Sequence, residues 1–253
     1  MESTKIHQIP KITTISNELF LVTDPSGAPK QVTLANIEKS LIPGGSLMDA
    51  YSDIAILYYG NSDNISRLAK IDKWESLEAG GEIAQGVVVF SGREQLVIAP
   101  NGSAKMPWSS ERKSAPGATQ TTIRRTAIND WGGESNTAAI ISASASDFIT
   151  DTIDYAPGYC NLYARANTSG NGMTAGKWWL PSLGELILMR AHLEKINYAL
   201  SKISGANPIP LDNHWSSTQY SATNAWYQYM STGTLYSNIK NISYHARPVS
   251  ALQ

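Results

Sequence analysis

Cysteine is nearly absent from this chain, whose 253 residues include Cys160 alone. An internal disulfide framework and a cysteine-based metal cluster are therefore excluded. An isolated cysteine most often behaves as a small hydrophobic residue, so we expect Cys160 to lie in the core.

Charge is also scarce. Charged residues make up 16% of the chain and hydrophobic residues 42%, with a formal net charge of -1. Nucleic acids and anionic membranes attract proteins that carry clustered positive charge, so neither is expected as a partner. Ser, Thr, Asn and Gly fill the deficit, as in β-rich proteins with wide polar surfaces.

Long apolar runs are missing as well. The chain contains no run of apolar residues that reaches the roughly 18 needed to span a membrane, so membrane insertion is not expected. Residues 1–14 hold no apolar run that could form the core of a signal peptide. We therefore expect a soluble protein, located in a virion or outside the cell without use of the general secretory route.

The stretch with the most unusual composition is residues 213–246. Of its 34 residues, 19 are Tyr, Ser, Thr or Asn, and its single formal charge is Lys240. Tyrosine offers a large rigid contact area with a polar tip, and Ser and Asn add adaptable hydrogen bonds; antibody paratopes use this mixture. The composition predicts a recognition surface.

Residues 225–231 alternate in a way that predicts a strand. One face of this strand would hold Trp226, Gln228 and Met230, and the other Tyr227, Tyr229 and Ser231. Gly233 supplies a turn, after which residues 234–237 would return as a second strand. From composition alone, an ordinary solvent-facing antiparallel sheet rich in Tyr and Thr is an equally good interpretation.

Three parts are expected along the chain. Residues 1–45 would form an attachment or oligomerisation module, with a strand at 18–23, a return strand at 31–33 and a short helix at 34–41. So small a unit has little core of its own, and oligomerisation is a usual remedy. Residues 46–80 would form a β connector with a hairpin, and residues 81–253 the ligand-binding domain.

Within residues 81–253 we expect an apolar hairpin at 86–90 and 95–99, and helices at 137–147, 156–166 and 183–203. The last helix has the strongest start, because Ser182 and Glu185 form a capping-box pattern. Gly205 would end it. Apolar residues recur along it at three- and four-residue spacing: Leu186, Met189, Leu193, Ile196, Leu200 and Ile203. The predicted class is α+β, with mixed antiparallel sheets and two to three helices, preceded by small β-rich modules.

An ordered set of short motifs resembles one family. In chain order the motifs are GVVVFSGREQLVIAP at 86–100, Trp108, SNTA at 135–138, WLPSLGEL at 179–186, WSS at 215–217, NAW at 224–226, Gly233 and RPV at 247–249. Together they resemble the C-type-lectin-like domain of bacterial surface proteins and of variable proteins of diversity-generating retroelements, with the phage major tropism determinant as a distant relative. The first 45 residues resemble attachment or trimerising modules of phage tail fibres.

The resemblance implies which residues would vary. In the retroelement proteins, adenine-directed mutagenesis rewrites Asn codons near the C-terminus, here at about 213–249. Residue types that can arise in this way stand at Tyr227, Tyr229, Ser231, Thr232, Thr234, Tyr236, Ser237, Ile239, Ile242 and Tyr244. Asn238 and Asn241 would be unmutated, and Tyr220 and His245 complete the expected ligand-binding set. The scaffold beneath the site would be Trp179, Trp215, Trp226, Gly233 and Arg247.

No enzymatic chemistry is expected. The four histidines have no zinc-ligand spacing, and phosphate loops, nucleophile elbows and paired-carboxylate motifs are missing. Formylglycine-generating enzymes use a similar scaffold with copper held by a pair of cysteines, which one cysteine cannot supply. Animal lectins hold calcium through Glu-Pro-Asn or Gln-Pro-Asp motifs, and the chain has neither. No metal or cofactor is predicted.

These observations predict a receptor-binding or adhesion protein that displays a diversified Tyr/Ser/Asn-rich surface on a C-type-lectin-like scaffold, on a phage tail. Its ligand would be a bacterial surface protein or glycan. A homotrimer would let several weak sites act together. The alternative is a structural virion or pilus-tip component whose C-terminal face packs on another subunit.

Overall fold

The computed structural model describes residues 19–23, 29–33, 53–92 and 94–252. The chain divides into two compact units, Met1–Ala50 and Tyr51–Gln253. In the first unit, β1 (Leu19–Thr23) pairs with β2 (Pro29–Thr33) in an antiparallel hairpin, as the sequence predicted. The predicted helix at 34–41 lies outside the described residues.

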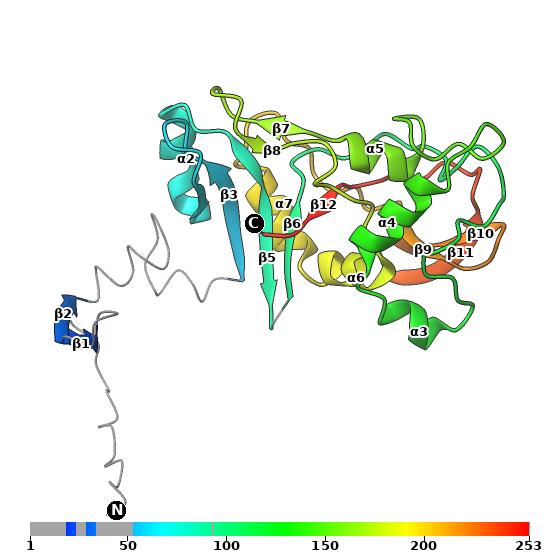
Figure 1. Ribbon diagram of the computed structural model, residues 1–253, viewed down its shortest axis with the longest axis horizontal. Coiled ribbons are helices and arrows are strands. Elements are labelled where there is room, and N and C mark those ends of the chain that lie inside the picture. The colour runs from blue at the N-terminus through cyan, green and yellow to red at the C-terminus, as the bar shows by residue number, and fades with distance from the viewer. Residues whose placement is uncertain (1–18, 24–28, 34–52, 93, 253) are drawn as a thin grey trace, which may run out of the picture. The chain divides into compact units, whose positions relative to one another are not determined.

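The second unit contains a five-stranded antiparallel sheet (Figure 1). Its strands, in spatial order, are β12 (Val249–Ser250), β6 (Glu94–Ile98), β5 (Ala84–Ser91), β3 (Ile54–Tyr59) and β4 (Ser66–Ala69). Both predicted hairpins are present. However, β3 pairs with β5, so residues 54–80 belong to the same unit as the rest and do not form a separate connector.

Burial of β3 on both faces explains this difference. Ile54 and Ile56 point into one hydrophobic cluster and Leu57 into another, so the strand is enclosed between two layers. A hairpin made of β3 and β4 alone could not bury both faces. Trp74 of α2 (Ile71–Ala79) is fully buried in the first cluster, with its ring centroid 5.8 Å from that of Tyr58 on β3.

The structure has six helices among its described residues, five of them within residues 81–253, where the sequence predicted two to three. Besides α2 they are α3 (Arg124–Ile128), α4 (Gly133–Ser142), α5 (Ala156–Leu162), α6 (Leu183–Ala191) and α7 (Leu193–Leu200). A short hairpin, β7 (Arg165–Ala166) and β8 (Gly172–Met173), follows α5. Cys160 of α5 is fully buried, as expected, and burial raises the pKa of its thiol.

Helix α4 begins earlier and ends earlier than predicted. Its N-cap is Gly132, so Asn136, which directly precedes the predicted start at residue 137, lies inside the helix and does not cap it. The Asn136 side chain instead donates to Asp130 Oδ2 (2.8 Å) and accepts from the Thr119 backbone N–H (2.8 Å). The Asn136 amide therefore stabilises the loop that contains Thr119.

Helix α5 also ends earlier than predicted, at Leu162 and not at residue 166.

The helix predicted at 183–203 is two helices. Its capping box is confirmed, since Ser182 accepts from the Glu185 N–H and the Glu185 carboxylate accepts from the Ser182 N–H. His192 breaks it with φ -109° and ψ 13°. The break lets α6 pack on the sheet that contains β9 (Asn213–Gln219) while α7 packs on β3 and β5.

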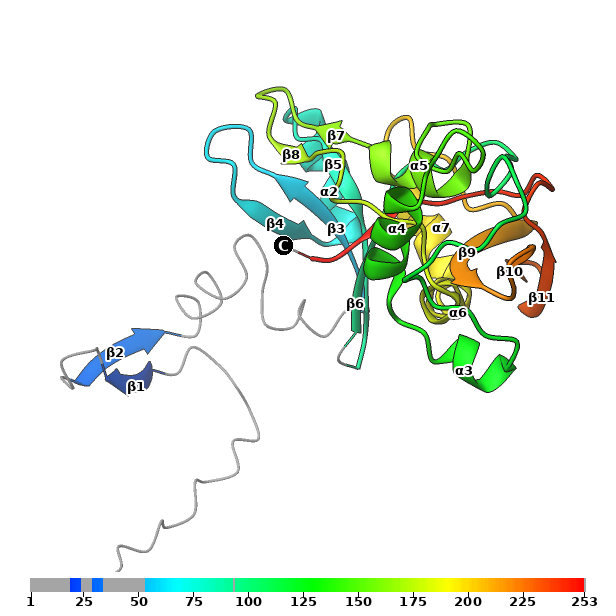
Figure 2. The ribbon, with the colours of Figure 1, turned by 45° about the vertical axis from the view of Figure 1, so that its right-hand side comes forward.

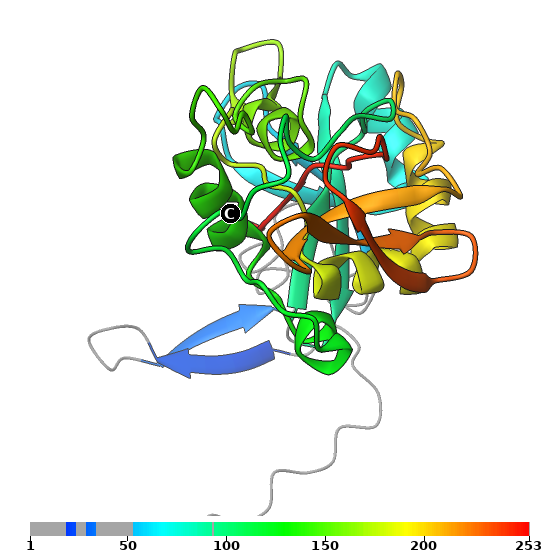
Figure 3. The same ribbon diagram turned by 90° about the vertical axis from the view of Figure 1, so that its right-hand side faces the viewer.

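The second unit also contains a three-stranded antiparallel sheet with the order β11-β10-β9, where β10 is Asn224–Tyr229 and β11 is Thr234–Ile239. This sheet lies at the opposite end of the unit from the five-stranded sheet (Figures 1 and 2), and α6 packs on its strands β9 and β10. Figure 3 shows the hairpin of β10 and β11, in orange to red, at the end facing the viewer. The fold class is α+β with antiparallel sheets.

Candidate functional site

The β10–β11 hairpin has the two-faced character that its sequence predicted. Trp226, Gln228 and Met230 are 5%, 2% and 0% exposed. Tyr227 and Tyr229 are half-buried on the other face. The hairpin closes through Gly233, whose φ of 77° places it in the left-handed region and whose N–H donates to Tyr229 O (2.8 Å).

The tryptophans predicted to lie beneath the site are buried and hydrogen-bonded. Trp226 donates its indole N–H to Thr121 O (2.9 Å), and Trp215 donates to Met106 O (3.1 Å). Trp179 donates to the Glu185 carboxylate (3.3 Å). Because each indole has an oxygen partner as well as its packing, the frame under the hairpin is fixed in position.

Arg247, which was also predicted as scaffold, is fully buried. Its guanidinium donates to the carbonyl oxygen of Ala99 (3.2 Å) and to the backbone and side-chain oxygens of Asn207 (2.7 and 2.9 Å). Burial lowers the pKa of Arg247 to about 10. These bonds connect the C-terminal strand to the loop after α7.

A chain of aromatic rings runs from the core to the surface. Trp215 and Tyr244 have ring centroids 4.6 Å apart, Tyr244 and Tyr227 are also 4.6 Å apart, and Tyr227 and Tyr236 are 6.0 Å apart. Tyr236 is the outermost ring and is 54% exposed. Burial, helped by Tyr244, raises the pKa of Tyr227 to about 12, so this phenol is neutral at physiological pH.

Tyr244 was predicted to be displayed, and that prediction is wrong. Tyr244 is only 9% exposed, and Asn238 Nδ2 donates to its hydroxyl (2.7 Å). Backbone hydrogen bonds to Met106 in both directions hold this segment against the core, which turns the ring inward. Tyr244 is therefore part of the frame under the site.

Two other predicted contacts lie apart from Tyr227. Tyr220 packs edge-on against Trp226 (5.1 Å), on the buried side of β10. His245 stacks on His214 (5.3 Å) and lines a separate cavity of about 340 Å³. Since neighbours along an extended segment point in opposite directions, the inward turn of Tyr244 carries His245 away from the hairpin.

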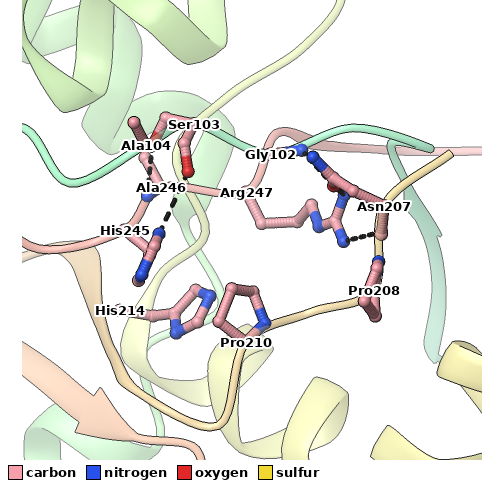
Figure 4. A pocket seen from close by; sticks show the side chains of 10 residues that line it. All are labelled: Gly102, Ser103, Ala104, Asn207, Pro208, Pro210, His214, His245, Ala246 and Arg247. Atoms are coloured by element: carbon pink, nitrogen blue, oxygen red, sulfur yellow. Dashed lines mark hydrogen bonds between the residues drawn. The ribbon is translucent and has the colours of Figure 1, made fainter. Parts of the chain in front are cut away.

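This cavity lies between residues 102–104, the proline-rich segment 207–210, and the two histidines (Figure 4). His245 Nδ1 pairs with Ser103 O (3.0 Å) and His214 Nδ1 with Asp212 O (3.0 Å). Burial lowers the pKa of His214 to about 3, so its ring is neutral. Both imidazoles therefore serve as hydrogen-bonded walls of the cavity.

The other predicted residues lie on the hairpin and its two turns. Ser237 and Ile239 are half-buried on the face that also carries Trp226. The remainder, with Tyr227 and Tyr236, we call the hairpin surface: Tyr227, Tyr229, Ser231, Thr232, Thr234, Tyr236, Asn238, Asn241 and Ile242. Its members are half-buried to exposed, and Ile242 is 37% exposed.

Sequence reasoning missed three arginines that contact the hairpin: Arg112, Arg124 and Arg190. They donate to Asn241 Oδ1 (3.2 Å), Leu235 O (2.7 Å) and Ser231 O (3.0 Å), respectively. Each comes from a different segment, far from the hairpin in sequence. A lone arginine in a loop or helix carries no signal that would reveal such a contact.

Lys240, the single formal charge of residues 213–246, is buried just after β11. Its ammonium donates to Gln219 Oε1 (2.7 Å) and to Lys113 O (2.5 Å), and lies 4.4 Å from the Trp108 ring centroid. Burial lowers the pKa of Lys240 to about 7. This side chain joins the turn after β11 to the loop that carries Arg112.

Among the residues that the structure describes, no group of three or more His, Cys, Asp or Glu side chains is arranged to hold a metal ion. The same part of the chain has no helix with the length and apolarity needed to cross a bilayer.

No family model matches the chain, and no curated protein does. Among solved structures, a fimbrial protein from Bacteroides ovatus ATCC 8483 is similar, with a TM-score of 0.40 and 18% sequence identity. The match covers 62% of this chain and 35% of the fimbrial protein, so this chain spans about a third of that protein's length.

Proposed function

We propose that this protein is a non-enzymatic binding protein that contacts its ligand through the hairpin surface. The observation that carries the proposal is the two-sided construction of β10: Trp226 and Met230 are anchored in the core while Tyr227 and Tyr229 face outward. Tyr236 extends this outward face at 54% exposure. Rigid tyrosines beside short hydroxyl and amide side chains are suited to recognition at low entropic cost.

The scaffold that we propose is a C-type-lectin-like domain, and the hairpin surface its variable region. Support comes from the ordered motifs and from burial, because nine of the ten residues that the resemblance marks as variable are half-buried or exposed, and Tyr244 is the exception. The three tryptophans and Arg247, which it marks as scaffold, are buried. In this proposal the protein is a receptor-binding component of a phage tail, acts as a homotrimer, and binds a bacterial surface molecule.

The test is a binding screen on intact bacterial cells and a glycan array with the full-length protein. The variant Tyr229→Ala/Tyr236→Ala removes two outward rings and leaves the frame in place. We expect at least tenfold weaker binding of this variant to any cell or glycan that the wild type binds. Thermal unfolding should be nearly unchanged.

Tyr198→Ala is the matched control. Tyr198 lies on α7, is 57% exposed, and belongs to the helix that packs on the five-stranded sheet. Its loss should leave binding intact. Equal binding by the wild type and the Tyr229/Tyr236 variant would refute the proposal, and a hairpin surface buried between subunits in solution would favour the structural alternative.

Diversification has its own test in the encoding DNA. The proposal requires an Asn-rich near-copy of the region that encodes residues 213–249, next to a reverse-transcriptase gene. If neither is found beside the gene, the retroelement part of the proposal fails while the binding part stands.

A further inference from the structure

The charge around the hairpin surface is one-sided. Residues 213–246 contain no Asp or Glu. The three arginines that contact the hairpin are placed around it: Arg190 at the turn between β10 and β11, Arg124 along the outer edge of β11, and Arg112 at the turn that follows β11. The hairpin is therefore bordered on three sides by positive charge.

None of these three guanidinium groups forms an ion pair with a carboxylate among the described residues. Two acidic residues in neighbouring loops are already occupied, since Asp212 pairs with Lys105 (2.6 Å) and Asp147 with Lys113. The positive charge of the arginines is thus not balanced by these neighbours.

The arginines retain hydrogen-bonding capacity. A guanidinium has five N–H donors, and Arg112 and Arg124, which are both exposed, each use one of them on the hairpin. The hydrogen bond to the hairpin already restricts the orientation of each arginine side chain. Binding a ligand therefore costs less side-chain conformational entropy. Planar guanidinium groups placed in this way match carboxylates in two-bond geometry.

We propose that the hairpin surface binds an acidic protein surface, with its tyrosines as the central contacts and Arg112, Arg124 and Arg190 as partners for carboxylates at the rim. This inference rests on the proposed function and adds the chemistry of the ligand. A protein fits the site better than a polysaccharide because Tyr236 and Ile242 expose apolar area on the same hairpin. Tyrosine and arginine are, with tryptophan, the residue types enriched at protein–protein hot spots.

The location of the arginines sets the kind of effect they should have. Charges at the rim of an interface act mainly on the association rate and its salt dependence, whereas the central rings act on the dissociation rate. With a Debye length of about 8 Å at physiological ionic strength, the steering weakens as salt is added. The two groups of residues can therefore be separated by kinetics.

The experiment selects binders from a displayed library of random peptides on the immobilised full-length protein. Clones are kept if they lose binding to Tyr229→Ala/Tyr236→Ala. We expect these clones to be enriched in Asp and Glu over the starting library, and their association rates to fall about tenfold in Arg112→Gln/Arg124→Gln. Raising the salt concentration should remove most of that difference.

Lys73→Gln/Lys202→Gln is the matched control, because it changes the net charge by the same amount at exposed lysines remote from the hairpin in the fold. Lys73 lies on α2, which packs on β3, and Lys202 follows α7. This variant should associate at nearly the wild-type rate. An equal loss in both double variants would show a non-specific effect of net charge and overturn the assignment to the rim.

The other outcomes separate this inference from the function on which it rests. Clones that depend on the tyrosines but show no excess of acidic residues would overturn the inference and leave the proposed function standing. A second outcome is that no peptide clone depends on Tyr229 and Tyr236, while polygalacturonate binds the wild type and not the double variant. The ligand would then be an acidic polysaccharide and not a protein. Absence of both would count against the proposed function itself.

Discussion

Tyr227 on β10 and Tyr236 on β11 lie directly opposite each other in the hairpin register, with ring centroids 6.0 Å apart. Tyr227 is supported from below by Tyr244 and Trp215, whereas Tyr236 is 54% exposed. These neighbouring rings therefore have different roles. Trp215, Tyr244 and Tyr227 stabilise the frame, and Tyr236 is available to a ligand.

This division predicts stability effects of very different size for two tyrosine substitutions. Tyr236→Ala should change the free energy of unfolding by no more than about 0.5 kcal/mol, as at other exposed positions. Tyr244→Ala should cost about 3 kcal/mol, because it leaves a cavity beside Trp215 and removes the acceptor of the Asn238 amide. Urea denaturation of both variants measures the difference. Equal losses would mean that Tyr236 is a core residue as well.

Glu185 should make the protein less stable as pH rises through the weakly acidic range. Its carboxyl is buried, and burial raises its pKa from 4.5 to about 7. The folded state therefore binds more protons than the unfolded state between pH 4.5 and 7, and stability falls by up to about 1.4 kcal/mol per pH unit there. Glu185→Gln, which keeps an acceptor oxygen for the Ser182 N–H, should flatten this part of the pH profile.

The control for Glu185 is Glu134→Gln, at an exposed position in the first turn of α4. That variant should keep the wild-type profile. Unfolding by urea at several pH values between 4.5 and 7 provides the measurement. If Glu185→Gln leaves the dependence of stability on pH unchanged, the Glu185 carboxyl of the folded wild-type protein is ionised throughout this range.

Lys240 should make the protein more stable as pH rises above 7, which is the opposite of the effect of Glu185. Burial lowers its pKa from 10.5 to about 7, so between these values the folded state binds fewer protons than the unfolded state. Stability should therefore rise with pH across this window, by up to about 1.4 kcal/mol per unit. The oxygen acceptors and the Trp108 ring favour the ammonium form, so they oppose the effect of burial on the pKa and limit the width of this window.

Lys240→Met removes the titrating group and should abolish the rise, while Lys202→Met, at an exposed lysine, should retain it. Chemical unfolding between pH 7 and 10 measures both. A rise that persists unchanged in Lys240→Met would assign the pH dependence to other groups.

Gly233 should be required for the tight turn of the hairpin. Its φ of 77° costs an L-residue about 1–2 kcal/mol, although a Cβ atom would find space there, 3.7 Å from the nearest atom of Arg190. Gly233→Ala should lower stability by about 1 kcal/mol. Gly233→Asn should lower it less, because Asn tolerates this region better, and the ranking of the two melting temperatures tests backbone conformation directly.

The features that the sequence predicted are those that local pattern determines. The Ser182–Glu185 capping box and the alternation around Trp226 involve residues within a few positions of one another. Their geometry follows from helix and strand periodicity alone.

The features that could not be predicted depend on contacts between distant segments. The break at His192 follows from α6 and α7 packing on different sheets, and β3 joins β5 across α2. Tyr244 has the same composition signal as Tyr236, yet its backbone pairing with Met106 turns it inward. Arg112 and Arg124 reach the hairpin from segments that show no pattern of their own.

The buried face of β10 has a consequence for protein engineering. Because Trp226, Gln228 and Met230 fix the strand from one side, substitutions at Tyr229, Thr234 and Tyr236 on the outward side leave the packing beneath them untouched. Randomising these three positions while keeping Tyr227 should therefore yield libraries in which most members still fold, and from which new specificities can be selected on a constant frame.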